Sequence, residues 1–159
     1  MKRLLLSLLL CLASASFLSA EVARPAPGVT WLDANGRTQS LAAFKGQSVI
    51  LIIAPSPKSW AFRSQVGQLQ KMYQRIAADR VVCLVAFTEE PGLIKSNIPF
   101  AIVADGPRAA YEYQTSAKFG IALIGRDGNL DYVTNHVLPV QRIYDIIGDS
   151  FVPQQQIRR

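Results

Sequence analysis

The chain has 159 residues, 17 of them Lys or Arg and 11 Asp or Glu, so its formal net charge is +6. This length corresponds to one ordinary domain with enough chain to build a core. The basic residues are spread along the sequence without a run or an aromatic-interleaved stripe, so we do not expect nucleic acid as a partner.

Residues 1–20 have the order of a secretory signal peptide. A positive Met-Lys-Arg start is followed by an apolar run over residues 4–12 and by small residues up to Ala20. The apolar run is too short for a membrane-spanning helix, which needs ~20 apolar residues. We therefore expect cleavage after Ala20 or Ala15, a secreted or periplasmic protein, and no stable membrane span after cleavage.

Behind the signal peptide, the pattern divides the chain into three parts. These are an N-terminal extension with a hairpin (21–47), a main domain (48–152) and a polar tail (153–159). Asn35-Gly36 is a strong turn signal for the hairpin. The main domain predicts, in order, a strand over 48–54, an amphipathic helix over 61–78, strands over 81–87 and 100–104, a short helix opening at Asp105, a strand pair over 119–134 and a final helix from Val140. Gly67, inside the long helix, suggests a close packing contact.

This order of elements predicts an α/β fold. Two near-continuous apolar runs joined by an amphipathic helix are typical of parallel neighbours in a buried sheet. A hairpin and a last helix complete a three-layer αβα sandwich with a central mixed sheet.

Cys83 is the only thiol once Cys11 leaves with the signal peptide, so no internal disulfide is expected. It lies within the apolar run over 81–87. Such a position predicts a buried thiol with a raised pKa and little reactivity.

Two segments carry a resemblance to a known family. Residues 55–62, Pro-Ser-Pro-Lys-Ser-Trp-Ala-Phe, are similar to the peroxiredoxin motif Pro-x-x-x-Thr/Ser-x-x-Cys. Pro55 and Ser59 match it, and Phe62 stands where the peroxidatic cysteine would be. The segment around Arg108 resembles the one whose arginine lies beside that cysteine. The chain thus resembles the thioredoxin-like superfamily in its peroxiredoxin branch, which implies a thioredoxin-like (peroxiredoxin-like) sandwich lacking the catalytic cysteine.

A second resemblance fits the missing cysteine better. Gln65, the pair Asp79-Arg80 and the segments 123–128 and 149–153 are similar to landmarks of the thioredoxin-like domain of unknown function 4174. That domain occurs in bacterial secreted proteins and in matrix proteins with sushi repeats, and its members lack the paired cysteines. The resemblance implies an exported, redox-inactive protein.

The resemblance to peroxiredoxins also implies where a binding site would lie. In the resembled fold, the turn over 55–62 and the helix opening at Pro107 are close together, so two helix N-termini and Arg108 would form a positive corner for a small anion or a carboxylate. The candidate binding residues are Pro55, Lys58, Ser59, Trp60, Phe62 and Arg108. Trp60 and Phe62 would be apolar anchors, and the hydroxyls of Ser56 and Ser59 are expected to cap the helix. The alternative, favoured because anion sites are few, is that Lys58 and Arg108 are ordinary surface charges or that Arg108 pairs with a structural carboxylate.

We expect a non-catalytic binding or interaction module whose partner is an unknown exported protein or a small anionic ligand. No catalytic residue, cofactor or metal site is expected, because His136 is the only histidine and no metal-ligand spacing is present. The alternative is an atypical, peroxiredoxin-like thiol-redox enzyme that uses Cys83.

The signal peptide gives the first testable prediction. When the full gene is expressed in a secreting bacterial host, the exported protein should begin at Glu21, or at Ser16 if the earlier site is used. N-terminal sequencing of the periplasmic or secreted product measures this directly. A membrane-bound product that retains Met1 would contradict it.

Overall fold

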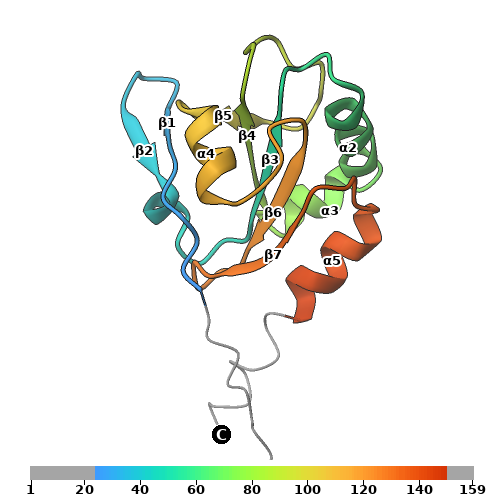
Figure 1. Cartoon of the computed structure of the whole chain (residues 1–159). Helices are drawn as coiled ribbons and strands as arrows, with labels where there is room; N and C mark the ends of the chain where they lie inside the picture. The colour runs from blue at the N-terminus through green and yellow to red at the C-terminus, as the bar shows by residue number, and fades with distance from the viewer. Residues whose placement is uncertain (1–23, 150–159) are drawn as a thin grey trace, which may run out of the picture.

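The computed structural model describes residues 24–149, so the predicted signal peptide and polar tail lie outside the described part of the chain. Within it, a five-stranded sheet has the order β5-β4-β3-β6-β7 and a separate two-stranded sheet pairs β1 with β2. The strands are β1 (Thr30–Leu32), β2 (Thr38–Ser40), β3 (Val49–Ala54), β4 (Val82–Phe87), β5 (Phe100–Ile102), β6 (Gly120–Ile124) and β7 (Leu130–Thr134). The helices are the 3-10 helix η1 (Leu41–Phe44), α2 (Trp60–Gln70), α3 (Tyr73–Ala78), α4 (Gly106–Glu112) and α5 (Val140–Asp149) (Figure 1).

The central strand is β3, and all six of its residues are buried. It pairs in parallel with β4 and antiparallel with β6, so the sheet is mixed. The predicted parallel pairing of the two apolar runs is therefore confirmed. No helix in the described part of the chain is both long and apolar enough to cross a membrane.

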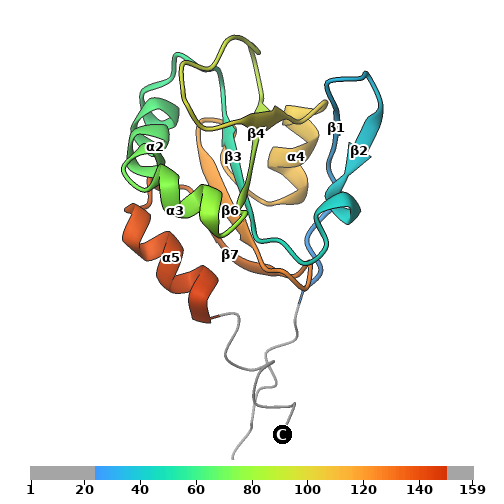
Figure 2. The same cartoon turned by 180° about the vertical axis from the view of Figure 1, so that it is seen from behind.

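Two separate hydrophobic cores cover the two faces of this sheet. On one face, Ile50 and Ile52 of β3 pack with side chains of α2, α3 and α5. On the other face, Leu51 and Ile53 pack with α4 and the N-terminal hairpin. The alternation of side chains along a strand sends neighbouring residues to opposite faces. The predicted three-layer sandwich is thus confirmed, with α2, α3 and α5 on the side opposite to α4 (Figures 1 and 2).

The N-terminal hairpin closes one edge of the sheet. The Asp33 carboxylate accepts hydrogen bonds from the backbone N–H groups of Asn35 and Arg37, which fixes the predicted turn. The backbone N–H of Ala104 donates to the carbonyl of Thr30 over 2.8 Å, just beyond β5. Residues of the extension therefore continue the sheet past β5.

The long helix predicted over 61–78 is wrong in one respect, because the structure has two helices there. The chain turns at Lys71 and Met72, where the N–H of Met72 donates to the carbonyl of Leu69 and α3 then begins. Neither residue is Gly or Pro, so the sequence carries no breaker at this point. The close contact expected at Gly67 is also absent, since an added Cβ would meet no atom within 4 Å.

The start of α4 follows the prediction closely. The Asp105 carboxylate caps the helix by accepting from the backbone N–H of Arg108 over 3.0 Å. Gly106 is the first helical residue and Pro107 the second. A Cβ at position 106 would collide with the carbonyl of Phe87, so glycine lets α4 begin directly against the end of β4.

A buried amide joins α2 to the chain that leads into α5. Gln65 is fully buried; its Oε1 accepts from the N–H of Leu138 over 2.7 Å, and its Nε2 donates to the carbonyl of Leu138 over 3.0 Å. The side chain thus pairs with a backbone as a neighbouring strand would. Both polar groups of Leu138 are satisfied in an otherwise apolar core.

This clamp gives the second prediction. Gln65→Met keeps the side-chain volume but leaves the N–H and the carbonyl of Leu138 without a partner, so the free energy of unfolding should fall by about 2–4 kcal/mol. Gln74→Met, at an exposed position of α3, is the matched control and should change it by less than about 0.5 kcal/mol. Chemical denaturation of both variants measures the difference, and equal effects would show that the clamp does not stabilise the fold.

Candidate functional site

The loop after β3 is tied to the loop after β4. The carbonyl of Pro55 accepts from the backbone N–H groups of Glu89 and Glu90 over 3.1 and 3.0 Å. Both loops lie at the carboxyl ends of parallel strands, where ligand sites of open α/β sheets occur. The two loops are therefore held side by side at one end of the sheet.

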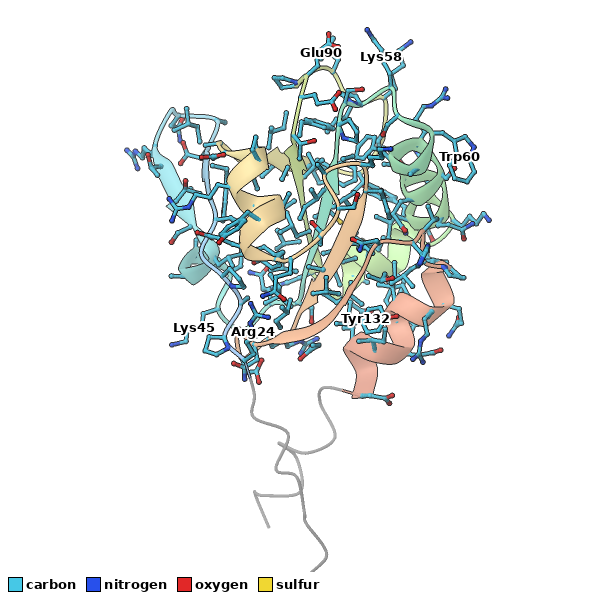
Figure 3. All side chains as sticks on the ribbon, in the orientation of Figure 1. Arg24, Lys45, Lys58, Trp60, Glu90 and Tyr132 are labelled. Carbon is cyan, nitrogen blue, oxygen red and sulfur yellow. The ribbon has the colours of Figure 1, made fainter. Side chains whose placement is uncertain are left out.

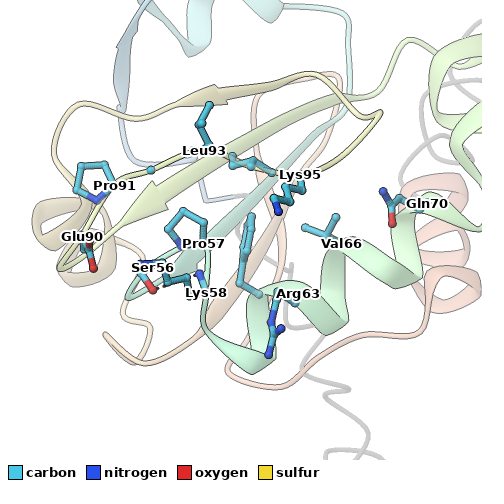
Figure 4. A pocket seen from close by; sticks show the side chains of 13 residues that line it. Ser56, Pro57, Lys58, Arg63, Val66, Gln70, Glu90, Pro91, Leu93 and Lys95 are labelled. Atoms are coloured by element: carbon cyan, nitrogen blue, oxygen red, sulfur yellow. Dashed lines mark hydrogen bonds between the residues drawn. The ribbon is translucent and has the colours of Figure 1, made fainter.

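Between these loops and α2 lies a groove with a volume of about 670 Å³. Figure 4 shows its three sides, which are the β3–α2 loop, one face of α2, and the connection from β4 to β5. The lining residues are Ser56, Pro57, Lys58, Phe62, Arg63, Val66, Gln70, Glu90, Pro91, Gly92, Leu93, Ile94 and Lys95. The volume is within the usual ~300–1,000 Å³ of small-ligand pockets.

The groove exists because the connection from β4 to β5 carries no helix. Parallel neighbouring strands are usually joined through a helix that covers the sheet. Here residues 88–99 contain neither helix nor strand, although Ile98 is buried in the α2-side core. The space that a crossover helix would fill beside α2 is left open to solvent.

Phe62, which the motif resemblance aligns with the peroxidatic cysteine, is a core residue. It is 2 % exposed, and its ring meets Phe87 edge-on at 5.4 Å and Phe100 at 6.1 Å between centroids. Phe62, expected as an apolar anchor of the binding site, is thus a packed residue of the apolar core. Because it also lines the groove, the ring gives the site an apolar floor rather than a reactive group.

The rim of the groove carries more positive than negative charge. Lys58, Arg63 and Lys95 are exposed cations on it, and Glu90 is the one acidic residue among those that line it. Lys58 and Glu90 lie at the same end of the molecule, whereas Trp60 points outward from α2 (Figure 3). Trp60 is 73 % exposed and does not line the groove.

The expected capping of α2 by serine hydroxyls is wrong. Ser59 occupies the N-cap position, but its hydroxyl makes no capping hydrogen bond and is buried without a partner among the described residues. The Ser56 hydroxyl accepts from the backbone N–H of Lys58 over 3.3 Å and so shapes the loop before the helix. The sequence contains two residues that could cap the helix, Ser56 and Ser59. It does not predict the side-chain rotamers that they adopt in the folded loop.

The expected positive corner around Arg108 does not form. Arg108 belongs to α4 and lines a different hollow, of about 290 Å³, together with Val29 and Thr30. Phe62 belongs to the core on the other face of the sheet. Arg108 instead pairs with Glu112 one helical turn away, over 2.8 Å, so the alternative of pairing with a carboxylate is confirmed. This hydrogen bond raises the pKa of the Arg108 guanidinium.

Cys83 is buried, as the apolar run predicts. It is 3 % exposed within β4, and burial raises the pKa of its thiol from 9.0 to about 12. The predicted raised pKa is thus confirmed. His136 is exposed beyond β7, and no group of three or more His, Cys, Asp or Glu side chains within residues 24–149 could hold a metal ion.

The wall of the groove opposite α2 was not predicted from the sequence. Leu93 is 94 % exposed, and together with Ile94 and Lys95 it faces α2 across the groove. The one signal was an apolar pair in a segment without helical or strand period. Such a pair does not show which element it will face.

Comparison with known proteins shows the fold. No protein family and no curated protein matches the chain by sequence. Among solved structures, the thioredoxin domain of a thiol-disulfide oxidoreductase from Bacteroides vulgatus is similar with a TM-score of 0.62 at 17% identity, over 80% of this chain and 96% of that one. A thiol:disulfide interchange protein from Bacteroides sp. gives 0.64 at 17% identity, over 79% and 90%.

A peroxiredoxin is similar to the same extent. The mitochondrial 2-Cys peroxiredoxin from Plasmodium falciparum gives a TM-score of 0.60 at 18% identity, over 82% of this chain and 94% of that one. The chain therefore has a thioredoxin-like α/β fold, with thiol oxidoreductases and peroxiredoxins as structural neighbours.

The buried thiol gives the third prediction. A pKa of about 12 in place of 9.0 lowers the thiolate fraction near neutral pH by about a thousandfold, so a thiol reagent should label native Cys83 slowly and the denatured chain at once. Rapid native labelling would contradict the burial.

The raised pKa also predicts a pH dependence of stability. Because the folded chain holds the proton more tightly than the unfolded chain, the contribution of Cys83 is complete below pH 9 and is lost as the pH rises toward 12. The difference in unfolding free energy between the wild type and Cys83→Ala should therefore shrink when the pH is raised from 8 to above 10, as denaturation at both pH values would show. A difference that stays constant would contradict the raised pKa.

Proposed function

We propose that this protein is an exported, non-catalytic module that binds its partner in the groove beside α2. The observation that carries the proposal is Phe62, a packed core ring at the position where peroxiredoxins hold their reactive cysteine. A peroxidase or disulfide oxidoreductase needs an accessible thiolate of lowered pKa. Cys83, the thiol in the described part of the chain, is buried with a raised pKa.

The resemblance to the thioredoxin-like domain of unknown function 4174 supports the same function. That resemblance rests partly on Gln65, and the buried clamp that this residue makes with Leu138 gives it a structural reason. The binding site that we propose keeps Lys58 and Phe62 from the sequence-based set. It adds Arg63, Val66 and the wall over 91–95. It leaves out Pro55, Ser59, Trp60 and Arg108.

The alternative function is thiol-redox catalysis through Cys83. Its support is the set of structural neighbours, which include thiol-disulfide oxidoreductases. A fold supports many chemistries, however, and activity depends on the site. The described site offers no accessible thiol to peroxide or to a disulfide.

The fifth prediction tests this choice. Purified protein should reduce neither hydrogen peroxide nor insulin disulfides above the level of its Cys83→Ser variant, because a buried thiol cannot attack either substrate. Coupled assays with an external reductant measure the turnover, and a thiol-disulfide oxidoreductase serves as the positive control. Turnover that Cys83→Ser abolishes would refute the binding proposal and establish the alternative.

A further inference from the structure

We propose that the occupant of the groove is an extended segment of a partner protein, with an apolar centre flanked by acidic residues. This inference rests on the proposed function and names the chemistry of its partner. Three features of the groove carry it: an unpaired backbone along one wall, an apolar floor, and a cationic rim.

The wall opposite α2 offers free backbone donors. Residues 91–93 form neither helix, strand nor turn, whereas at 94–96 the N–H of Ser96 donates to the carbonyl of Ile94 over 3.1 Å and closes a three-residue turn. Among the described residues, the backbone N–H groups of Gly92, Leu93, Ile94 and Lys95 have no hydrogen-bond partner. Adjacent N–H groups of an extended segment point to opposite sides, so the inference needs alternate ones: those of Leu93 and Lys95 would meet one edge of a bound peptide. Main-chain pairing of this kind is a common way to bind an extended segment.

The floor suits apolar side chains of such a segment. Phe62 and Val66 are buried beneath the groove, and Pro57 also lines it. Because these side chains are already held in place, binding an apolar residue against them would cost the protein little conformational entropy. Leu93 stands 94 % exposed on the wall. Contact with a bound segment would remove this leucine from water, which stabilises the complex.

The charges on the rim favour a segment with acidic residues on either side of its apolar centre. Lys58, Arg63 and Lys95 oppose a single acidic residue, Glu90. Rim charges of one sign steer and select partners of the opposite sign. The terminal segments of this chain are poor occupants, because residues 150–159 contain two arginines and no acidic residue, and residues 1–23 contain two basic residues and only one acidic residue.

The experiment is a selection from a displayed library of random nonapeptides on the purified protein, followed by affinity measurement on a labelled peptide from the enriched set. The enriched peptides should share an apolar centre with Asp or Glu on both sides. Arg63→Glu combined with Lys95→Glu should weaken their binding by about tenfold or more, since two attractive charges become repulsive.

The matched control reverses two charges outside the groove. Lys71→Glu combined with Arg142→Glu changes the net charge equally at exposed positions that do not line the site. It should leave the affinity within about threefold, which separates groove contacts from long-range charge. Equal weakening by both double variants would overturn the proposed site.

A second pair of variants tests the backbone pairing. Leu93→Ala removes the side chain and keeps the N–H, whereas Leu93→Pro removes both. Leu93→Pro should bind the peptide at least about fivefold more weakly than Leu93→Ala, the equivalent of one lost hydrogen bond. Thermal melting of each variant checks that the fold is retained, and equal affinities would overturn the pairing.

Decanoate, a small amphipathic anion, is the competing probe. If decanoate occupies the groove and no acidic peptide is enriched, the occupant is a small ligand and the inference is wrong. Enrichment of basic or uncharged peptides would also overturn it. These failures differ from failure of the proposed function, which would appear as Cys83-dependent turnover in the redox assays.

Discussion

The complete burial of β3 is the constraint on which the rest of the structure depends. Its alternating side chains supply both cores, and its backbone pairs with a strand on either side, so the strand has one position and one register. Pro55 follows directly, and its carbonyl holds Glu89 and Glu90. The β3–α2 loop, the start of α2 and the start of the β4–β5 connection are thereby fixed relative to one another. The sheet therefore fixes the position of the loops that form the groove. A preformed site of this kind loses little conformational entropy on binding.

Phe62, which the motif resemblance aligns with the peroxidatic cysteine, shows how this fold can be stable with an aromatic ring at that position. A reactive thiol at the start of a helix must be accessible and is stabilised as a thiolate by the helix N-terminus. An aromatic ring at the same position instead joins Phe87 and Phe100 and adds to the core. Reactivity requires an exposed side chain at this position, whereas stability favours a buried one. The buried ring of Phe62 contributes to stability. Arg108, which the resemblance placed beside that position, is instead paired with Glu112 on the other face of the sheet.

Features set by local pattern could be predicted from the sequence, and features set by packing could not. The two apolar runs, the Asp105 cap and the burial of Cys83 follow from neighbouring residues alone, and each is present in the structure. The break at Lys71 and Met72 has no local breaker, because it arises where the chain must bring Ile76 back onto the sheet. The missing hydrogen bond of the Ser59 hydroxyl and the position of Arg108 likewise depend on which face of the sheet each helix covers. The motif over 55–62 therefore supplies four of the thirteen residues that line the groove, and the wall over 91–95 could not be predicted from the sequence.

That wall follows from the topology of the sheet. A parallel step from β4 to β5 needs a long connection, and in this protein the connection is an irregular loop rather than a helix. A helix would satisfy its own backbone, whereas this loop leaves the N–H groups of residues 92–95 without a partner among the described residues, much as an edge strand leaves its donors unpaired. Proteins commonly blunt such edges with charge, and Lys95 and Glu90 stand at either end of this one. The same charges that discourage pairing with a neutral strand favour pairing with a segment of complementary sign. Protection from indiscriminate association and the proposed selection of an acidic partner would then be two consequences of one arrangement of residues.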